Sequence, residues 1–141
     1  MLNFMINIAH KKYEIMDFTV HGDHNGNLIS LEQDKNLPFT VRRVYYIYDI
    51  PKNIVRGKHA HKKNEQIIIC LSGSCDFILD DGKTKKTFHL NDPSKGLYIG
   101  SDVWREFSCF SPDCVIMVLA STLYDENDYI RDYNEFLRII G

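Results

Sequence analysis

This chain of 141 residues has no large excess of positive or negative charge, no long apolar run and no secretion leader. Its 17 basic and 19 acidic side chains leave a formal net charge of −2, which gives no electrostatic case for binding nucleic acid or an anionic membrane. No apolar stretch approaches the roughly 20 residues needed to span a bilayer, and the first residues lack the basic flank of a signal peptide. We therefore expect a cytoplasmic enzyme or binding protein, with no nucleic-acid or membrane partner.

Cysteine is also scarce, with two pairs at Cys70 and Cys75 and at Cys109 and Cys114. Each pair has four residues between its members, and this spacing suggests a zinc site. Each pair straddles a turn signal, however, and zinc knuckles prefer tighter pairs. Disulfides are not expected without a secretion signal. We interpret all four as reduced cysteines packed in strands, because free cysteine behaves as a small buried hydrophobe.

Short β-branched and aromatic runs, separated by turn residues, follow one another through the middle of the chain. The expected strands cover residues 28–31, 39–49, 65–71, 75–79, 84–90, 96–99, 103–110 and 114–120. Many short strands without helical periods indicate an antiparallel sandwich or barrel. Only the tail, residues 124–140, has apolar side chains at three- and four-residue intervals. The sequence therefore predicts an all-β, jelly-roll-like single domain over residues 1–141 with a short C-terminal helix.

The run of residues 56–65 (RGKHAHKKNE) carries the candidate site. Strand side chains repeat their direction every second residue, so His59 and His61 point the same way. Two converging imidazoles make either a metal site or a proton-transfer site. The spacing of these histidines and Glu65 resembles the first motif of the cupin superfamily, whose metal site takes a further histidine from a second motif. Arg105 stands at that second position, and a guanidinium cannot ligate a cation, so we predict no metal.

Residues 39–49 place an arginine on an otherwise apolar face. Alternation along a strand puts Phe39, Val41, Arg43, Tyr45 and Ile47 on the same side. A charge on a core-facing row must find a partner or a ligand. Arg43 is therefore a candidate for substrate binding. The alternative is a register shifted by one residue, which would put Arg43 in solvent.

Five runs together closely resemble the dTDP-sugar 3,4-ketoisomerases, small metal-free cupins of bacterial surface-polysaccharide pathways. They are residues 43–49 (RVYYIYD), 56–63 (RGKHAHKK), 96–99 (GLYI), 118–121 (VLAS) and 124–131 (YDENDYIR). The likeness extends from about residue 22 to residue 137. It implies a cupin barrel and the conversion of dTDP-4-keto-6-deoxyglucose to a dTDP-3-keto-6-deoxyhexose, on which an aminotransferase then acts at C3.

The chemistry implied by this resemblance needs no cofactor. The C3 hydrogen is α to the C4 carbonyl, so a positioned base removes it to give an enediol, and a proton returned to C4 completes the shift. We assign His59 as the base, Tyr45 as its hydrogen-bonding or proton-relay partner, and His61 as a second acid/base or orienting group. Arg43 and Arg56 are expected to hold the pyrophosphate or the sugar oxygens.

The resemblance also implies a homodimer in which an N-terminal strand is exchanged, so the segment 1–38 is expected to reach the partner's sheet. Two substrate-side positions depart from common family patterns. Asn25 stands where many relatives carry arginine, and Arg105 stands where many carry histidine. In the family, arginine at the second position goes with a gluco-configured product, which we therefore predict.

Three other functions stay open from the sequence. A metal-dependent cupin of the dioxygenase type would use His59, His61 and Glu65. A dTDP-sugar 3,5-epimerase is also a cupin-like enzyme that uses histidine, and it is disfavoured by the extent of the ketoisomerase motifs. A non-catalytic sugar-nucleotide sensor would bind the same ligand without turnover.

Overall fold

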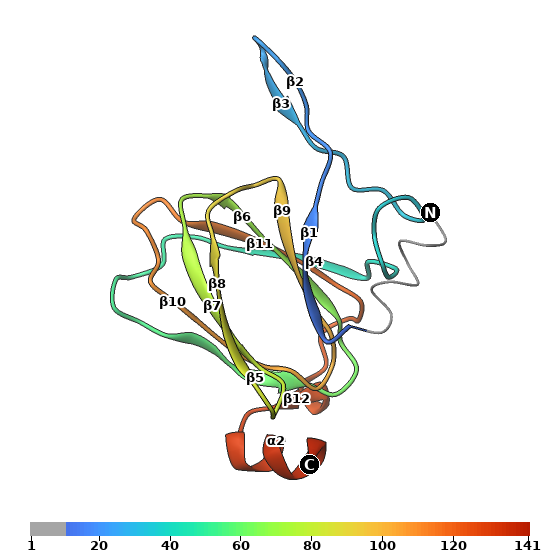
Figure 1. Ribbon diagram of the computed structural model, residues 1–141, viewed down its shortest axis with the longest axis vertical. Helices are drawn as coiled ribbons and strands as arrows, with labels where there is room; N and C mark the ends of the chain where they lie inside the picture. The colour runs from blue at the N-terminus through green and yellow to red at the C-terminus, as the bar shows by residue number, and fades with distance from the viewer. Residues whose placement is uncertain (1–10) are drawn as a thin grey trace.

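Two five-stranded antiparallel sheets pack face to face in the computed structural model, which describes residues 11–141 (Figure 1). In spatial order the first sheet contains β1 (Tyr13–Asp17), β9 (Lys95–Ile99), β6 (Gln66–Ser72), β11 (Val115–Ala120) and β4 (Arg43–Ile47). The second contains β12 (Tyr129–Ile130), β5 (Arg56–His61), β10 (Trp104–Ser108), β7 (Cys75–Asp80) and β8 (Lys85–Leu90). The predicted all-β, cupin-like jelly roll with one short C-terminal helix is confirmed.

The main core lies between the two sheets. Its buried side chains alternate along the strands, for example Phe77 and Leu79 on β7 with Ile116 and Val118 on β11. Alternation of this kind is what a strand with one core-facing side requires. The turn that joins β7 to β8 forms at Asp81 and Gly82, where Asp81 N–H donates to the Thr84 carbonyl and Gly82 takes a positive φ of 91°.

A second cluster covers the outer face of the first sheet. Leu37 and Phe39 pack there with Ile67 of β6 and Tyr98 of β9, and Ile29 and Leu31 lie against the same cluster. The strand predicted over residues 28–31 is wrong except for Leu28, which ends β3 (Gly26–Leu28). Ile29 and Leu31 instead cover the sheet from outside, and this gives the segment the same composition as a strand.

The C-terminal helix is shorter than residues 124–140. The chain instead forms a 3₁₀ turn, η1 (Glu126–Asp128), then β12, and only afterwards α2 (Tyr133–Ile140). Asp132 begins this helix as its N-cap, accepting the Glu135 N–H at 2.8 Å. The apolar spacing in the sequence placed Tyr129 in the predicted helix. Tyr129 lies instead in β12, opposite His61 on β5, so that spacing runs across the boundary between a strand and the helix.

The β2–β3 hairpin, β2 (His21–Asp23) and β3 (Gly26–Leu28), extends away from the barrel and is exposed along its whole length (Figure 1). In the preceding segment β1 pairs with β9 of the same chain. The hairpin is thus the part of segment 1–38 placed to reach a second copy. Strand exchange stays a prediction, and residues 1–10 of that segment lie outside the described residues. Among residues 11–141, no helix is both long and apolar enough to cross a membrane.

Candidate active site

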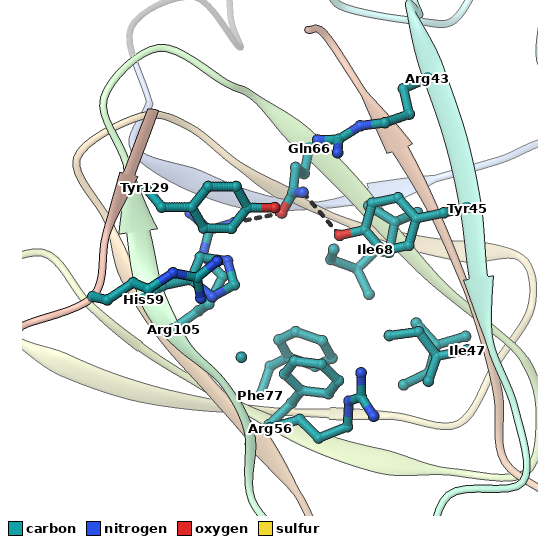
Figure 2. A pocket seen from close by; sticks show the side chains of 15 residues that line it. Arg43, Tyr45, Ile47, Arg56, His59, Gln66, Ile68, Phe77, Arg105 and Tyr129 are labelled. Atoms are coloured by element: carbon teal, nitrogen blue, oxygen red, sulfur yellow. Dashed lines mark hydrogen bonds between the residues drawn. The ribbon is translucent and has the colours of Figure 1, made fainter. Parts of the chain in front are cut away.

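A cavity of about 390 Å³ opens between the sheets and is lined by side chains of β4, β6 and β11 from the first sheet and of β5, β7, β10 and β12 from the second (Figure 2). Its polar wall holds Arg43, Tyr45, Arg56, His59, Gln66, Arg105, Tyr129 and Arg131. Its apolar wall is formed by Ile47, Ile68, Phe77, Phe107, Ile116 and Val118. The cavity therefore combines a cationic, hydrogen-bonding side with an apolar side, as expected of a small-molecule site.

Strand β4 presents Arg43, Tyr45 and Ile47 to the cavity, so the predicted inward row is confirmed for these three residues. Phe39 and Val41 precede β4 and pack instead in the cluster on the outer face of the first sheet. The Arg43 guanidinium lies 5.4 Å from the centre of the Tyr45 ring and 5.7 Å from that of Tyr124. Its Nε is buried and has no hydrogen-bond partner among the described residues. Arg43 is half-buried, and its unpaired Nε retains hydrogen-bonding capacity for an anionic ligand.

Tyr45, Gln66 and Arg105 form a hydrogen-bonded chain across the cavity (Figure 2). Gln66 donates to the Tyr45 hydroxyl at 3.0 Å, and Arg105 donates to the Gln66 carbonyl oxygen at 2.7 Å. Arg105 is only 1% exposed and also donates to the Val103 carbonyl. Burial lowers the pKa of Arg105 to about 10, so it is still a cation at neutral pH, and burial raises the pKa of Tyr45.

The two histidines occupy different places. His59 lines the cavity, whereas His61 is fully buried behind it, with the ring centres 4.8 Å apart. His61 Nδ1 lies 2.9 Å from an Asp128 carboxylate oxygen, and Asp128 also accepts the Lys63 N–H. With a carboxylate as its partner, Nδ1 carries the hydrogen, and Nε2 is the free nitrogen. His61 therefore contacts His59 and not the cavity itself.

The environment of His59 keeps its imidazole neutral. Burial, followed by the positive charge of Arg105 on the neighbouring strand, lowers the pKa of His59 to about 2. Burial and the charges of Arg105 and Arg43 also lower the pKa of His61, while the Asp128 carboxylate favours its charged form. His59 is therefore a neutral imidazole on the cavity wall.

The cupin ligand set is not assembled. The Glu65 carboxylate accepts a hydrogen bond from the Tyr98 hydroxyl and is not grouped with the two histidines. Within residues 11–141, His, Cys, Asp and Glu side chains converge in one group of three, formed by Cys70, Cys75 and Cys114. The dioxygenase-type alternative therefore lacks its expected ligand geometry.

Five of the seven predicted site residues meet in the cavity: Arg43, Tyr45, Arg56, His59 and Arg105. His61 lies behind them, and Asn25 lies on the β2–β3 hairpin, outside its own chain's cavity. Sequence reasoning did not select Gln66, Tyr129, Arg131 or Asp128. Gln66 could have been found as a polar residue at the start of the apolar run 66–70, but residues 128–131 were hidden by their helical interpretation.

Comparison with known proteins links this geometry to one group of enzymes. The family FdtA, described as WxcM-like, C-terminal, matches residues 11–141. A TDP-4-oxo-6-deoxy-alpha-D-glucose-3,4-oxoisomerase from Aneurinibacillus thermoaerophilus is 50% identical over 128 residues, which span 91% of this chain and 92% of the relative.

Solved structures agree. QdtA, a sugar 3,4-ketoisomerase from Thermoanaerobacterium thermosaccharolyticum in complex with TDP, has a TM-score of 0.90 at 44% identity, over 93% of this chain and 96% of that one. WlaRB, a TDP-quinovose 3,4-ketoisomerase from Campylobacter jejuni, has a TM-score of 0.87 at 50% identity, over 91% and 98%. The fold is that of the cupin-like isomerases. The chain belongs to the FdtA (WxcM-like, C-terminal) family, and its resemblance to the dTDP-sugar 3,4-ketoisomerases is confirmed.

Proposed function

We propose that the protein converts dTDP-4-keto-6-deoxyglucose to a dTDP-3-keto-6-deoxyhexose. The observation that carries this proposal is a neutral His59 imidazole on the wall of a cavity that also holds the Tyr45 hydroxyl and the buried Arg105 cation. A form of the relative QdtA has been crystallised with TDP-4-keto-6-deoxyglucose, which supports the choice of substrate.

The reaction changes the position of two protons on the substrate and exchanges no electrons with an external partner. His59 takes the C3 proton, and the C3–C4 enediolate forms as the C4 carbonyl oxygen gains negative charge. Arg105 and the Tyr45 hydroxyl are positioned to stabilise that charge, a contribution often worth about 3 kcal/mol for each donor. The C3 hydroxyl then loses its proton, the C4 oxygen gains one, and protonation of the C4 carbon gives the 3-keto sugar, so no redox cofactor or metal is needed.

Arginines on the polar wall are assigned to the diphosphate. Arg43 and Arg56 line the cavity on β4 and β5, and Arg43 has no carboxylate partner among the described residues. Guanidinium groups bind phosphate oxygens through paired, charge-assisted hydrogen bonds. Arg131 on the same wall is already paired with Glu126 at 2.7 Å, so we give it a smaller part.

His61 and Asp128 are assigned to positioning. His61 is fully buried, and its ring packs edge-on against that of His59, while Asp128 fixes its tautomer. A ring held in one orientation limits the rotation of the ring beside it. The sequence left two roles open for His61, a second acid/base or an orienting group. We assign it the orienting role, and Asp128 supports it.

The working protein is proposed to be a cytoplasmic homodimer. The edge strand β4 exposes Val44 and Tyr46 at 54% and 66%, and Tyr48, just beyond its end, is 60% exposed, which gives an apolar and aromatic row suited to a second copy. The β2–β3 hairpin of that copy would bring Asn25 to the cavity. Arg105 in the wall favours the gluco-configured product, which would serve amino-sugar synthesis for lipopolysaccharide O-antigen or a similar bacterial surface polysaccharide.

Product NMR after incubation with dTDP-4-keto-6-deoxyglucose tests the proposal. We expect the 3-keto isomer without added metal and in the presence of EDTA. His59→Asn should lower turnover at least about 100-fold, the usual loss for a general base, while TDP binding persists because the arginines are intact. Activity that EDTA abolishes and one divalent ion restores would contradict the mechanism, and binding without isomerisation would indicate a sensor.

A further inference from the structure

Three cysteines from distant parts of the chain meet at one end of the core. Cys70 lies on β6, Cys75 begins β7, and Cys114 immediately precedes β11. Their sulfur atoms all lie within 4.8 Å of one another, and Cys70 Sγ and Cys114 Sγ are 3.9 Å apart. All three side chains are buried and none is in a disulfide. The fourth cysteine, Cys109, is exposed and does not belong to the group.

Two turns hold this arrangement in place. Ser74 and Ser111 exchange hydrogen bonds between the β6–β7 turn and the segment before β11, with Ser74 N–H donating to Ser111 Oγ at 2.8 Å and Ser111 N–H to the Ser74 carbonyl at 2.9 Å. Gly73 lies between them at φ 68°, where an added Cβ would meet Ser111 Oγ at 2.1 Å. These hydrogen bonds hold the β6–β7 connection against the segment that carries Cys114.

The geometry matches thiolate coordination. Zinc binds cysteine sulfur at about 2.3 Å and takes four ligands in a tetrahedron, which separates neighbouring sulfurs by about 3.8 Å. The observed separations need only a small contraction to reach that value. Simple core packing explains three small buried side chains, but it does not require three sulfurs to converge on one point.

We propose that Cys70, Cys75 and Cys114 form a thiolate site for a zinc-type divalent cation, separate from the cavity. Soft thiolate ligands select zinc among the abundant divalent ions. On binding, the three thiols lose three protons to solvent and form three sulfur–metal bonds, with no change of oxidation state. The fourth coordination position is left for water or for the Ser72 carbonyl oxygen. That oxygen already accepts a hydrogen bond from the Cys70 thiol at 3.2 Å.

The site is structural, since no cysteine lines the cavity. The metal would join β6, β7 and β11, two strands of the first sheet and one of the second. Binding to the folded chain alone raises its stability. The zinc-loaded chain should therefore unfold at a higher temperature than the metal-free chain, and isomerase activity should not depend on the ion.

Anaerobic titration of the reduced full-length chain with Co²⁺ gives the first test. We expect one Co²⁺ per chain, thiolate-to-cobalt charge-transfer bands in the near ultraviolet, intense visible bands of tetrahedral cobalt, and loss of both when Zn²⁺ is added. Cys75→Ala and Cys114→Ser should abolish the bands, whereas Cys109→Ser, the matched exposed control, should keep them.

X-ray absorption on the zinc-loaded wild-type chain decides the matter even if the core variants fail to fold. Three sulfur neighbours at about 2.3 Å per zinc are expected. Fewer sulfurs, no saturable binding, or cobalt bands lost on Cys109→Ser would overturn the proposal. Isomerase activity that disappears on removing the zinc would overturn its separation from the cavity.

Discussion

At the scale of single residues, Arg105 controls metal binding and protonation at the neighbouring histidines. Its guanidinium is buried, lies on the strand beside His59 and has no carboxylate partner among the described residues. A fixed positive charge there opposes a metal cation and also opposes protonation of the imidazole. The same residue thus disfavours a metal cation and keeps the His59 imidazole neutral.

The histidine environment predicts an unusual titration. Because the folded-state pKa of His59 lies far below the unfolded value of about 6.5, the ring should stay neutral as pH falls through 6.5 and down to about pH 5. The unfolded chain binds that proton and the folded chain does not, so this histidine makes the fold lose stability as pH falls below 6.5.

Histidine proton NMR and the pH profile of kcat/KM check this prediction. Arg105→Gln removes the charge and should raise the pKa of His59, moving the acid limb of the profile to higher pH. The urea-unfolded chain provides the reference titration. A wild-type His59 resonance that titrates near 6.5 would show that burial and Arg105 do not control the ring.

Asp128 offers a second prediction at this scale. In Asp128→Asn the amide can donate to His61 Nδ1, which favours the wrong tautomer and loosens the packing of His61 against His59. We expect kcat to fall about 10- to 100-fold, as for other groups that orient a functional histidine, with KM nearly unchanged.

A matched control for this change is Asp132→Asn, because asparagine caps the start of α2 as well as aspartate does. It should leave kcat unaltered. The Nδ1-bound proton of His61 should be visible by NMR in the wild type and lost in Asp128→Asn. Loss of activity with that resonance retained would mean that Asp128 acts by another route.

At the scale of elements, the alternation of side chains along a strand predicts the site residues correctly on a strand that has one buried side. Residues 43–47 of β4 carry polar groups inward in the expected register, because Arg43 and Tyr45 share their face with Ile47. Residues 28–31 and 124–132 could not be predicted in this way. In the first, Ile29 and Leu31 cover a sheet without joining it. The second passes from a 3₁₀ turn to strand β12 just before α2 begins at Tyr133, so tertiary contacts override any local period.

Helix α2 supports the part of the site that sequence reasoning missed. Phe136 is fully buried and packs against Trp104, Ala60 and Ile130, the residue of β12 that follows Tyr129. Phe136→Ala should lower the free energy of unfolding by about 3–5 kcal/mol, the usual cost of removing a buried phenylalanine ring. It should also reduce turnover, because β12 carries Tyr129 to the cavity.

Urea denaturation and steady-state kinetics measure both effects of this change. Leu137→Ala, one residue along and 37% exposed, is the control and should cost far less. A Phe136→Ala chain of near wild-type stability would mean that α2 does not hold β12 against the barrel.

At the scale of the whole molecule, the position of Asn25 could not be predicted from sequence spacing. The β2–β3 hairpin carries it away from its own cavity, while five of the other predicted residues meet there. Either Asn25 has no part in the reaction, or it acts on the cavity of a second copy. In the second case, the effect of Asn25 on the stereochemistry of the product depends on the dimer.

Arg105 is long, permanently charged and fork-shaped, whereas histidine at this position is shorter and exchanges protons near neutral pH. Replacing one by the other changes both the position of the sugar and the groups able to deliver a proton to C4. We expect the wild-type chain to give mainly dTDP-3-keto-6-deoxyglucose, and the Arg105→His, Asn25→Arg double variant to shift the product toward the galacto epimer. The couplings among H3, H4 and H5 identify each product by NMR.

A mixing experiment separates action within one chain from action between two. One chain carries Asn25→Arg with His59→Asn, so its own cavity is inactive, and the other carries only Arg105→His. If the hairpin of one copy completes the cavity of the other, mixed dimers formed by co-expression pair an arginine at position 25 with a histidine at position 105 in one working site. The galacto fraction should then exceed that of the Arg105→His chain alone. An unchanged product ratio from verified mixed dimers would show that Asn25 does not act across the interface, and a mainly galacto product from the unmodified chain would refute the role given to Arg105.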